Sequence, residues 1–314
     1  MSEQPSQALT ETLAQYPFTR PVARLLRHNE NLTYAVEDGP RRYLLRVHRE
    51  AKGLDFSMFR GGFDRATLVE SELELLRRLQ EAGGLRLQRP VANAAGRYAT
   101  RLTNGETASV LTWLKGETLA SGIPDARQAE RLGRLLARLH RAAEGLAPLR
   151  RCRYDGAFVD RVQAGLDAAF QDGHFAAAPY RQMKALCALL GTLLDREQSR
   201  FQLVHGDLSR SNLLDGAEGL AAIDFSMAGY SLPELDVGDL LCACGDRWAA
   251  PLLAGYAAEG GRPLEREAIE LFYAFSVVGY VAIHHGALWT QDSFGRNLER
   301  WSGTIFAPLL ARRS

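Results

Sequence analysis

The segment "VHGDLSRSNLLDGAEGLAAIDFSMAG", residues 204–229, sets a histidine, three aspartates and an asparagine into two short apolar runs. The stretches "FQLVHGD", "NLLD" and "LAAIDFS" are too short for stable helices, and each delivers a polar residue at an end or a turn. Polar side chains held at the ends of rigid elements are typical of functional loops. The chain must therefore form a fold in which short strands present a polar site.

The polar residues of this segment have the spacing of a metal and phosphate site. Asn212 follows Asp207 by five positions, and Asp224 closes the next strand, so the three side chains can surround one pocket. Their oxygens suit Mg²⁺, which proteins hold with one or two carboxylates together with substrate phosphates. Phosphoryl transfer needs an aspartate to orient the attacking hydroxyl, and an Asn and an Asp to hold the metal. The spacing predicts these roles for Asp207, Asn212 and Asp224.

The rest of the chain divides into a strand-rich part and a helical part. Residues 31–49 have two β-rich runs around "EDGPR", which predicts a hairpin, and residues 66–84 have the apolar spacing of a helix that ends in glycines. Further short strands are expected after residue 97, and a helix over 125–145 opens a mainly helical remainder. Because 314 residues exceed the size of one usual core, two packed units are expected.

Composition limits the classes of partner and the location. The formal net charge of +1 argues against a general binder of nucleic acid or membrane surfaces. The four cysteines show no C-x-x-C spacing, which favours reduced thiols in a cytoplasmic protein. The most apolar stretch, residues 271–283, is too short to span a bilayer and is expected to be a buried helix. The oligomeric state stays open.

The loop motifs resemble those of kinases. "HGDLSRSN" stands in place of H-R-D-x-x-x-x-N, and "DFS" in place of D-F-G. The glycine after the histidine makes the chain similar to the aminoglycoside phosphotransferase and choline kinase family. "SVLTWLKGETL" resembles the hinge strand of that family, "LGRLLARLH" its helix ending in histidine, and "GYSLPELDVGDLL" its segment after the metal aspartate.

The resemblance implies an α+β, bilobal, protein-kinase-like fold. We expect a β-rich nucleotide-binding lobe over residues 1–109, a hinge over 110–116, and a mainly helical lobe over 117–314 that carries catalysis and binds the substrate. The ligand would be ATP or GTP in the cleft between the lobes, a usual place for small-molecule sites. The hinge residues expected at the nucleotide base are Thr112, Trp113 and Leu114.

The phosphate-binding side of the predicted nucleotide site lacks a familiar motif. The sequence has no G-x-x-x-x-G-K-[ST] loop and no G-x-G-x-x-G loop. The stretch "RHNENLTYAV" would instead cover the phosphates through backbone N–H groups, Asn29, Asn31 or Thr33.

An arginine stands where kinases carry a lysine. On the strand "RYLLRVHR" the position that grips the phosphates is Arg46, and its expected partner is Glu72 on the following helix, with Glu70 as a competitor. Arginine keeps the positive charge and can bind phosphate through two N–H groups. Strand alternation alone leaves open that Arg46 is a solvent-facing residue.

Several other polar residues have weaker assignments. His205 is assigned to support of the loop, and Asp236 and Asp239 are as readily explained by a helix start or a salt bridge. The pair His284 and His285 has no third metal ligand, so a pocket wall or a core position is favoured. Five aromatic residues are expected first of all to pack in the core: Trp248, Tyr256, Tyr273, Tyr280 and Trp289.

The leading hypothesis is an ATP- or GTP-dependent, Mg²⁺-requiring phosphotransferase that acts on a hydroxyl of a small metabolite. Amino alcohols, homoserine-like compounds, sugars and aminoglycosides are the candidate acceptors. Two alternatives remain. A Ser/Thr protein kinase would use the same aspartate and metal, although no A-P-E follows "DFS". A pseudokinase would bind the nucleotide without turnover.

Overall fold

The computed structural model describes residues 6–28, 31–49 and 57–313. A five-stranded antiparallel sheet forms the N-terminal part, in the order β1-β2-β3-β5-β4. Its strands are β1 (Val22–His28), β2 (Asn31–Asp38), β3 (Arg41–His48), β4 (Ala99–Arg101) and β5 (Thr107–Thr112). The predicted hairpin is confirmed as β2 and β3, which join at a tight turn where Gly39 takes a positive φ of 59°. Thr33 pairs with Arg46, and Arg46 with Ser109 on β5.

Two elements of the N-terminal part were not predicted. Helix α1 (Gln7–Gln15) begins at Ser6, whose side chain accepts a hydrogen bond from the Leu9 N–H, and packs on the sheet. Strand β1 lies at the sheet edge, and none of its residues is buried. Without a buried face the strand has no alternation of apolar and polar residues to reveal it.

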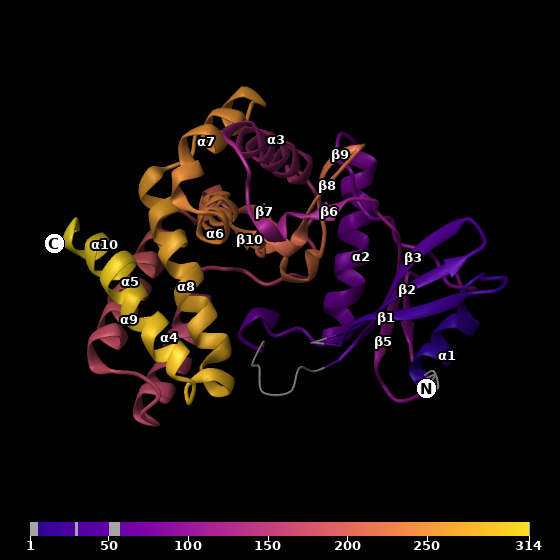
Figure 1. Cartoon of the computed structure of the whole chain (residues 1–314), viewed down its shortest axis with the longest axis horizontal. Helices are drawn as coiled ribbons and strands as arrows, with labels where there is room; N and C mark the ends of the chain where they lie inside the picture. The colour runs from indigo at the N-terminus through magenta and orange to yellow at the C-terminus, as the bar shows by residue number, and fades with distance from the viewer. Residues whose placement is uncertain (1–5, 29–30, 50–56, 314) are drawn as a thin grey trace.

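The predicted helix after the hairpin is confirmed as α2 (Arg65–Ala82). Asp64 caps its start by accepting from the Thr67 N–H at 2.9 Å, and Gly83, with a φ of 76°, ends it. The helix lies between the sheet and the helical part of the molecule (Figure 1). Helix α2 therefore packs against both the sheet and the helical part.

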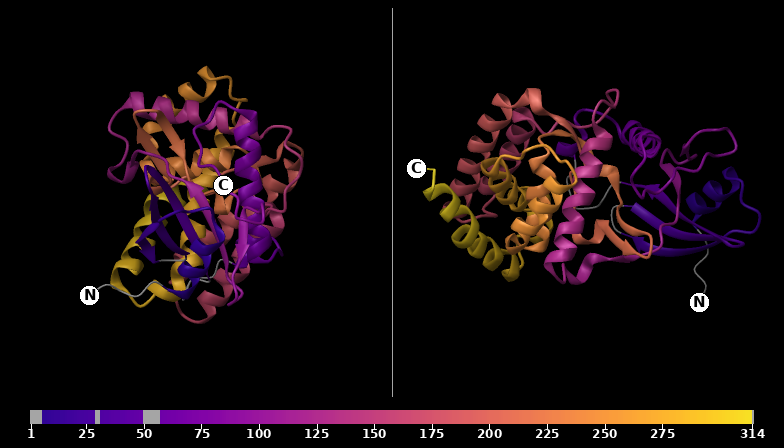
Figure 2. Two further views of the ribbon diagram at one scale, coloured as in Figure 1. Left: turned by 90° about the vertical axis from the view of Figure 1, so that its right-hand side faces the viewer. Right: turned by 90° about the horizontal axis from the view of Figure 1, so that it is seen from above.

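Helices dominate the remainder of the chain and lie at the opposite end from the sheet (Figure 2). They are α3 (Ala126–Ala143), α4 (Gly156–Gln171), α5 (Ala177–Arg196), α6 (Glu234–Cys244), α7 (Ala249–Ala258), α8 (Arg266–Leu288), α9 (Asp292–Trp301) and α10 (Ala307–Ala311). Short strands carry the loop motifs of this part: β6 (Glu117–Thr118), β7 (Gln202–Val204), β8 (Leu213–Gly216), β9 (Gly219–Ala222) and β10 (Gly229–Ser231). The observed α+β arrangement agrees with the predicted fold class.

The buried apolar residues form three clusters. One fills the helical part around α4, α5 and α8, and another lies between α1 and the sheet. The third joins α2 and residues of β3 and β5 to α3, α6 and α7, so one core spans both parts of the chain. The predicted boundaries of the hinge, after residue 109 and after residue 116, stay predictions. Strand β5 runs across the first of them.

Helix α8 is longer than the apolar run seen in the sequence. Its length of 23 residues, with a mean hydropathy of 1.4 over an 18-residue window, is enough for a membrane crossing by length and composition alone. The expected buried helix is nevertheless confirmed, because the apolar residues on one side of α8, among them Val278 and Val281, belong to the helical core. The four cysteines are free thiols.

Candidate active site

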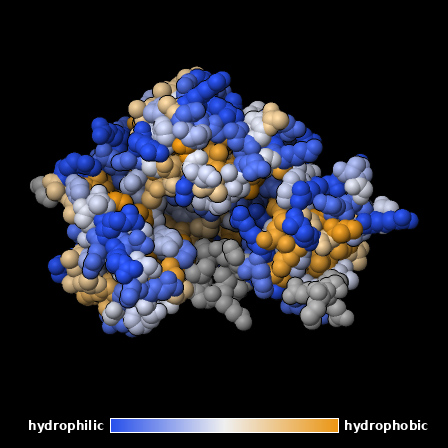
Figure 3. Space-filling view, viewed as in Figure 1, coloured by the Kyte–Doolittle hydropathy of each residue, from blue (hydrophilic) through white to orange (hydrophobic). Residues whose placement is uncertain are grey.

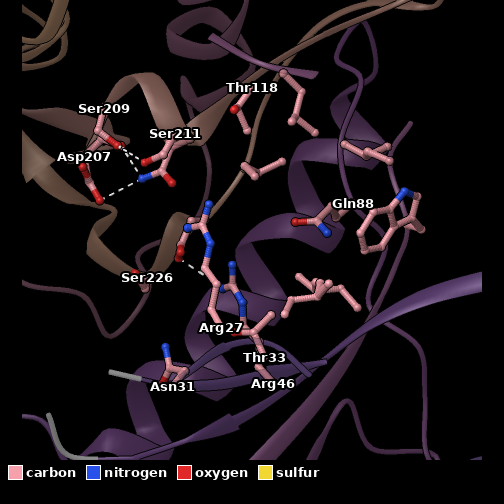
Figure 4. A pocket seen from close by; sticks show the side chains of 18 of the residues that line it. Arg27, Asn31, Thr33, Arg46, Gln88, Thr118, Asp207, Ser209, Ser211 and Ser226 are labelled. Carbon is pink, nitrogen blue, oxygen red and sulfur yellow. Dashed lines mark hydrogen bonds and ion pairs between the residues drawn. The ribbon is translucent and has the colours of Figure 1, made fainter. Parts of the chain in front are cut away.

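A cavity of about 390 Å³, called here the first cavity, lies where the sheet meets the loops of the helical part. The surface is hollowed between these two parts in Figure 3. Figure 4 shows that Arg27, Thr33 and Arg46 enter from the strands, while Asp207 and Ser209 face them from the loop after β7. The predicted residues that line the first cavity are Asn31, Thr33, Arg46, Trp113, Leu114, Asp207, Asn212 and Asp224.

The loop after β7 fixes Asp207 against Asn212. The Asn212 Nδ2 donates to the Asp207 carboxylate Oδ2 at 2.8 Å and to its backbone carbonyl at 3.1 Å. Gly206 makes the turn possible, because it has a φ of 77° and an added Cβ would lie 2.5 Å from the Met227 carbonyl. Burial raises the pKa of Asp207 above its ordinary value. The carboxylate is held in one orientation beside the cavity.

Asp224 lies opposite this loop in a left-handed backbone conformation with a φ of 66°. Among the described residues it is the only one other than glycine with positive φ, and such positions cluster at functional sites. Burial raises the pKa of its carboxyl, but the Arg46 guanidinium and the hydrogen bonds from Ser226 together hold that pKa below its ordinary value. Asp224 is therefore kept as a carboxylate.

Arg46 joins two acids across the back of the cavity. Its Nη1 lies 3.1 Å from the Asp224 Oδ1 and 3.4 Å from the Glu72 Oε1. Arg46 is 6% exposed and Glu72 is 4% exposed, so the alternative of a solvent-facing arginine is wrong. Burial raises the pKa of Glu72, and the Arg46 charge opposes that rise. Glu70, the competitor, is exposed, because it lies on the other face of α2.

The donor atoms around the cavity fit a hard cation. Since the Asn212 Nδ2 donates to Asp207, the Oδ1 is the atom of this amide that could ligate a cation. An amide oxygen and the Asp224 carboxylate are ligands that Mg²⁺ accepts. No group of three His, Cys, Asp or Glu side chains that could hold a metal occurs in the described part of the chain. A divalent ion at this site would thus take its remaining ligands from substrate or water.

A second cavity, of about 320 Å³, adjoins the first and shares Asp207 and Met227 with it. Helix α8 supplies one wall, and residues of η1 (Ser57–Arg60), α4 and α6 supply the others. Six of its lining residues are Phe or Tyr: Phe59, Tyr154, Phe158, Phe272, Phe275 and Tyr280. Asp207 therefore stands between a polar cavity and an aromatic one.

Comparison with known proteins gives the family. The chain matches the model of the phosphotransferase enzyme family, APH, over residues 22–272. The chain belongs to this family. It is accordingly a kinase-like phosphotransferase that acts on hydroxyl groups. No curated protein sequence matches the chain significantly.

Solved structures of phosphotransferases share the fold. The microcompartment-associated aminopropanol kinase is 20% identical with a TM-score of 0.73, and the alignment covers 93% of each chain. The amicoumacin kinase in complex with AMP-PNP, Ca²⁺ and Ami is 19% identical with a TM-score of 0.74, over 95% of this chain and 92% of that one. Choline kinase from Cryptosporidium parvum is 12% identical with a TM-score of 0.63, over 93% and 89%. These likenesses establish a protein-kinase-like fold.

The hinge residues of this phosphotransferase differ in their access to the first cavity. Trp113 and Leu114 line it, whereas Thr112 does not, and its contact with the nucleotide stays a prediction. The Thr112 hydroxyl accepts from the Arg89 N–H at 2.8 Å, and its own N–H donates to the Arg89 carbonyl at 2.9 Å. Thr112 is thus bonded to the segment before β4 that contains Arg89. Asn29, also named for the phosphates, lies outside the described residues.

Arg27 is a cavity residue that the sequence did not reveal. It lies on β1, lines the first cavity, and reaches toward the loop of Asp207 in Figure 4. Because the edge strand β1 has no sequence signature, nothing marked Arg27 as a site residue.

Two acids of α6 hold the backbone of the loop that carries Asp207. Asp236 accepts from the N–H groups of His205 and Gly206, each at 2.9 Å, and from His140 Nε2 at 2.9 Å. Asp239 accepts from the Leu208 N–H at 2.7 Å. Asp236 and Asp239 are three residues apart on a helix, which places both on one face. This spacing is the sequence signal that could have indicated a shared role.

His205 and Arg151 support the neighbouring segments. The His205 Nε2 lies 3.1 Å from the Ile223 carbonyl, which agrees with its predicted role in loop support. Arg151 is buried and donates to the carbonyls of Phe225 at 2.7 Å and Ala228 at 2.6 Å. Its guanidinium thereby fixes the turn after Asp224, although its sequence context "LRRCRYD" gave no hint of this.

Proposed function

We propose that this phosphotransferase moves the γ-phosphoryl group of ATP or GTP to a hydroxyl of a small metabolite with the help of Mg²⁺. The observation that carries the proposal is the convergence of Asp207, Asn212, Asp224 and Arg46 on the first cavity, with Asp207 also lining the second. The first cavity would hold the nucleotide, and the second would hold the acceptor.

Asp207 is proposed to receive the acceptor hydroxyl. The hydroxyl oxygen attacks the γ-phosphorus, the bond to the β–γ bridging oxygen breaks, and the nucleoside diphosphate leaves. The hydroxyl proton passes to the Asp207 carboxylate, which burial has made more basic than an ordinary aspartate. Asn212 keeps the Asp207 carboxylate oriented through its Nδ2. Alignment of the reacting atoms supplies much of the rate.

Asn212 and Asp224 are proposed to hold the magnesium ion through oxygen atoms. Mg²⁺ bound there would neutralise charge on the phosphates. Arg46 faces the same cavity with a guanidinium that already contacts Asp224, so it can hold a phosphate oxygen as a lysine would. Glu72 fixes the Arg46 guanidinium from behind and does not itself line the first cavity.

The strand side is proposed to hold the rest of the nucleotide. Asn31, Thr33 and Arg27 line the first cavity beside Arg46 and are placed for the phosphates. The Asn31 Oδ1 is buried and has no hydrogen-bond partner among the described residues, so this side chain has bonding capacity left for a ligand. At the hinge, Leu114 would meet the base, because its backbone has no hydrogen bond to another backbone group among the described residues, whereas the Trp113 N–H donates to the Arg42 carbonyl.

A small acceptor is favoured over a protein. The second cavity has the volume of a small-molecule pocket, and four of its aromatic lining residues are buried: Tyr154, Phe158, Phe272 and Phe275. Kinases of small molecules with the same fold, such as aminopropanol kinase, support this choice. A cytoplasmic location and the lack of nucleic-acid or membrane partners stay predictions.

The test is transfer from γ-labelled ATP or GTP, with Mg²⁺, to pools of amino alcohols, amino acids, sugars and aminoglycosides and to a protein extract. Label is expected on a small molecule with the wild-type protein and not with Asp207→Ala. Label on protein bands would move the assignment to a protein kinase. Nucleotide binding with no transfer to any acceptor would support the pseudokinase alternative.

A further inference from the structure

One face of α8 opens the second cavity. Phe272, Phe275, Gly279 and Ile283 line the cavity at spacings of three and four residues, so they lie on the same side of the helix. Gly279 is in the middle of this face, and a Cβ built on it would meet no atom within 4 Å. Glycine costs about 1 kcal/mol relative to alanine inside a helix. The missing side chain leaves room for a group of the ligand.

Aromatic rings surround this room. Phe158 is the centre of the cluster, with ring centroids 4.9 Å from Tyr154, 5.2 Å from Phe59 and 6.0 Å from Phe275. The Tyr154 hydroxyl is used, since it donates to the Met227 carbonyl. The cluster therefore offers the ligand an apolar surface and few hydrogen-bond partners.

The acidic groups of the second cavity are concentrated at one end. Among the described lining residues only Asp207 and Asp239 are acidic. Asp239 lies on α6 and accepts from the N–H of Leu208, the residue that follows Asp207. The two carboxyl groups are therefore close to one another. If Asp207 receives the acceptor hydroxyl, one carboxylate remains for one cationic group beside it.

We propose that the acceptor is a hydroxylated monoamine with an apolar, ring-sized body: the hydroxyl at Asp207, the ammonium at Asp239 and the body against Gly279 and the aromatic cluster. This inference rests on the proposed phosphotransferase function. Ammonium groups buried without partners are strongly disfavoured. Asp239 is the one acidic lining residue left for charge pairing once Asp207 receives the hydroxyl, so a compound with several amines would leave the others without an acidic partner in the described lining of the cavity.

The first test compares three acceptors with the wild-type protein, ATP and Mg²⁺. They are 2-amino-3-phenylpropan-1-ol, its amine-free analogue 3-phenylpropan-1-ol, and the polycation kanamycin. We expect kcat/KM for the aromatic amino alcohol to exceed that for either of the others by about tenfold or more, the size of a pocket-level discrimination. A preference for kanamycin or for the amine-free alcohol would overturn the inference.

Two variants test the two contacts separately. Asp239→Asn keeps an oxygen acceptor for the Leu208 N–H and should reduce the preference for the amine over its amine-free analogue to about one. Gly279→Leu should fill the room on α8 and lower kcat/KM for 2-amino-3-phenylpropan-1-ol about tenfold relative to the smaller 2-aminopropan-1-ol. Each readout is a ratio within one protein, which a general loss of folding does not move. Unchanged ratios in both variants would contradict the inference.

Gly286→Leu is the matched control for the filled cavity. Gly286 is on the same helix, is exposed, and does not line the second cavity. In Gly286→Leu the ratio of kcat/KM between the two amino alcohols should equal that of the wild type. An equal fall of this ratio in both leucine variants would refute the role of Gly279.

Binding measured by titration calorimetry separates the inference from the function on which it rests. Binding of 2-amino-3-phenylpropan-1-ol that weakens in Asp239→Asn, with no transfer to any acceptor, would support the ammonium contact at Asp239 and refute the proposed function. Transfer to sugars alone, with no binding of the aromatic amino alcohol, would support the function and refute the inference.

Discussion

The two cavities that meet at Asp207 are built from different chemistry. The first cavity has guanidinium, carboxylate, amide and hydroxyl groups delivered by strands and loops, and the second is walled mainly by aromatic side chains, many of them on helices. Charged groups suit phosphate and metal, whereas aromatic walls select the shape of an organic body. In the proposed function, reaction chemistry and acceptor choice are carried by separate walls, so we expect that each can be changed separately.

The largest effect is expected where the cavities share a side chain. Asp207→Asn keeps the shape but cannot accept a proton, so kcat should fall by about 10²- to 10⁴-fold. Steady-state transfer at saturating nucleotide measures it. Asp172→Asn, at the exposed C-terminal end of α4, is the control and should match the wild type. A fall of less than about tenfold would show that Asp207 does not receive the proton.

Loss of the metal should affect only the first cavity. Excess EDTA is expected to abolish transfer, and Asp224→Asn should raise the Mg²⁺ concentration for half-maximal rate by about tenfold or more, because a carboxylate ligand becomes a neutral amide. A Mg²⁺ titration of the rate gives the answer. Asp215→Asn is the control, since Asp215 lies on β8 and pairs with Arg131 outside the cavity. An unchanged Mg²⁺ requirement in Asp224→Asn would remove Asp224 from the metal site.

Arg46→Lys asks whether the arginine works as a replacement for the usual lysine. Arg46 contacts Glu72 and Asp224 at once, and an ammonium is a smaller group without the planar fork. We expect kcat/KM for the nucleotide to fall about tenfold, the loss of one charge-assisted hydrogen bond. Arg41→Lys, at the exposed β2–β3 turn, serves as control. A lysine variant as active as the wild type would show that only the charge matters.

The support of the Asp207 loop should give the protein a distinct pH dependence. Burial, reinforced by the nearby charge of Asp207, raises the pKa of Asp239 to about 7. The ordinary pKa in an unfolded chain is about 3.9, so between these values the folded state binds more protons than the unfolded state. The contribution of Asp239 to stability is present below about pH 4 and is lost as the pH rises to about 7.

Urea unfolding of the wild type and Asp239→Asn at pH 5 and pH 8 tests this sign. The free energy of unfolding of the wild type, relative to that of the variant, should be lower at pH 8 than at pH 5. Parallel values at the two pH conditions would show that Asp239 titrates normally.

The smallest effect is expected at Thr112, the predicted hinge residue that does not line the first cavity. Thr112→Val removes the hydroxyl that accepts from the Arg89 N–H, at a cost of about 1 kcal/mol in the free energy of unfolding. Because Thr112 does not line the first cavity, the KM for the nucleotide should change by no more than about twofold. A large rise in the KM for the nucleotide with an unchanged free energy of unfolding would show that Thr112 contacts the nucleotide.

The sequence alone predicted that Asp207, Asn212 and Asp224 would surround one pocket, and all three line the first cavity. The prediction was possible because Asp207, Asn212 and Asp224 lie on one continuous run of short strands and turns, so local structure alone brings them together. The choice of Glu72 over Glu70 also followed from local periodicity, since the buried leucines of α2 fix which face of the helix meets β3.

Tertiary structure alone determined which residues, distant in the sequence, lie beside the segment of Asp207, Asn212 and Asp224. Arg27 comes from an edge strand without apolar alternation, and Arg151 reaches the turn after Asp224 from a segment more than 70 positions earlier in the sequence. The second cavity gathers aromatic rings from η1, α4 and α8, which no sequence pattern had grouped together. Periodicity reports which face of an element is buried, and only the packing of elements decides whether that face meets another side chain or an open cavity.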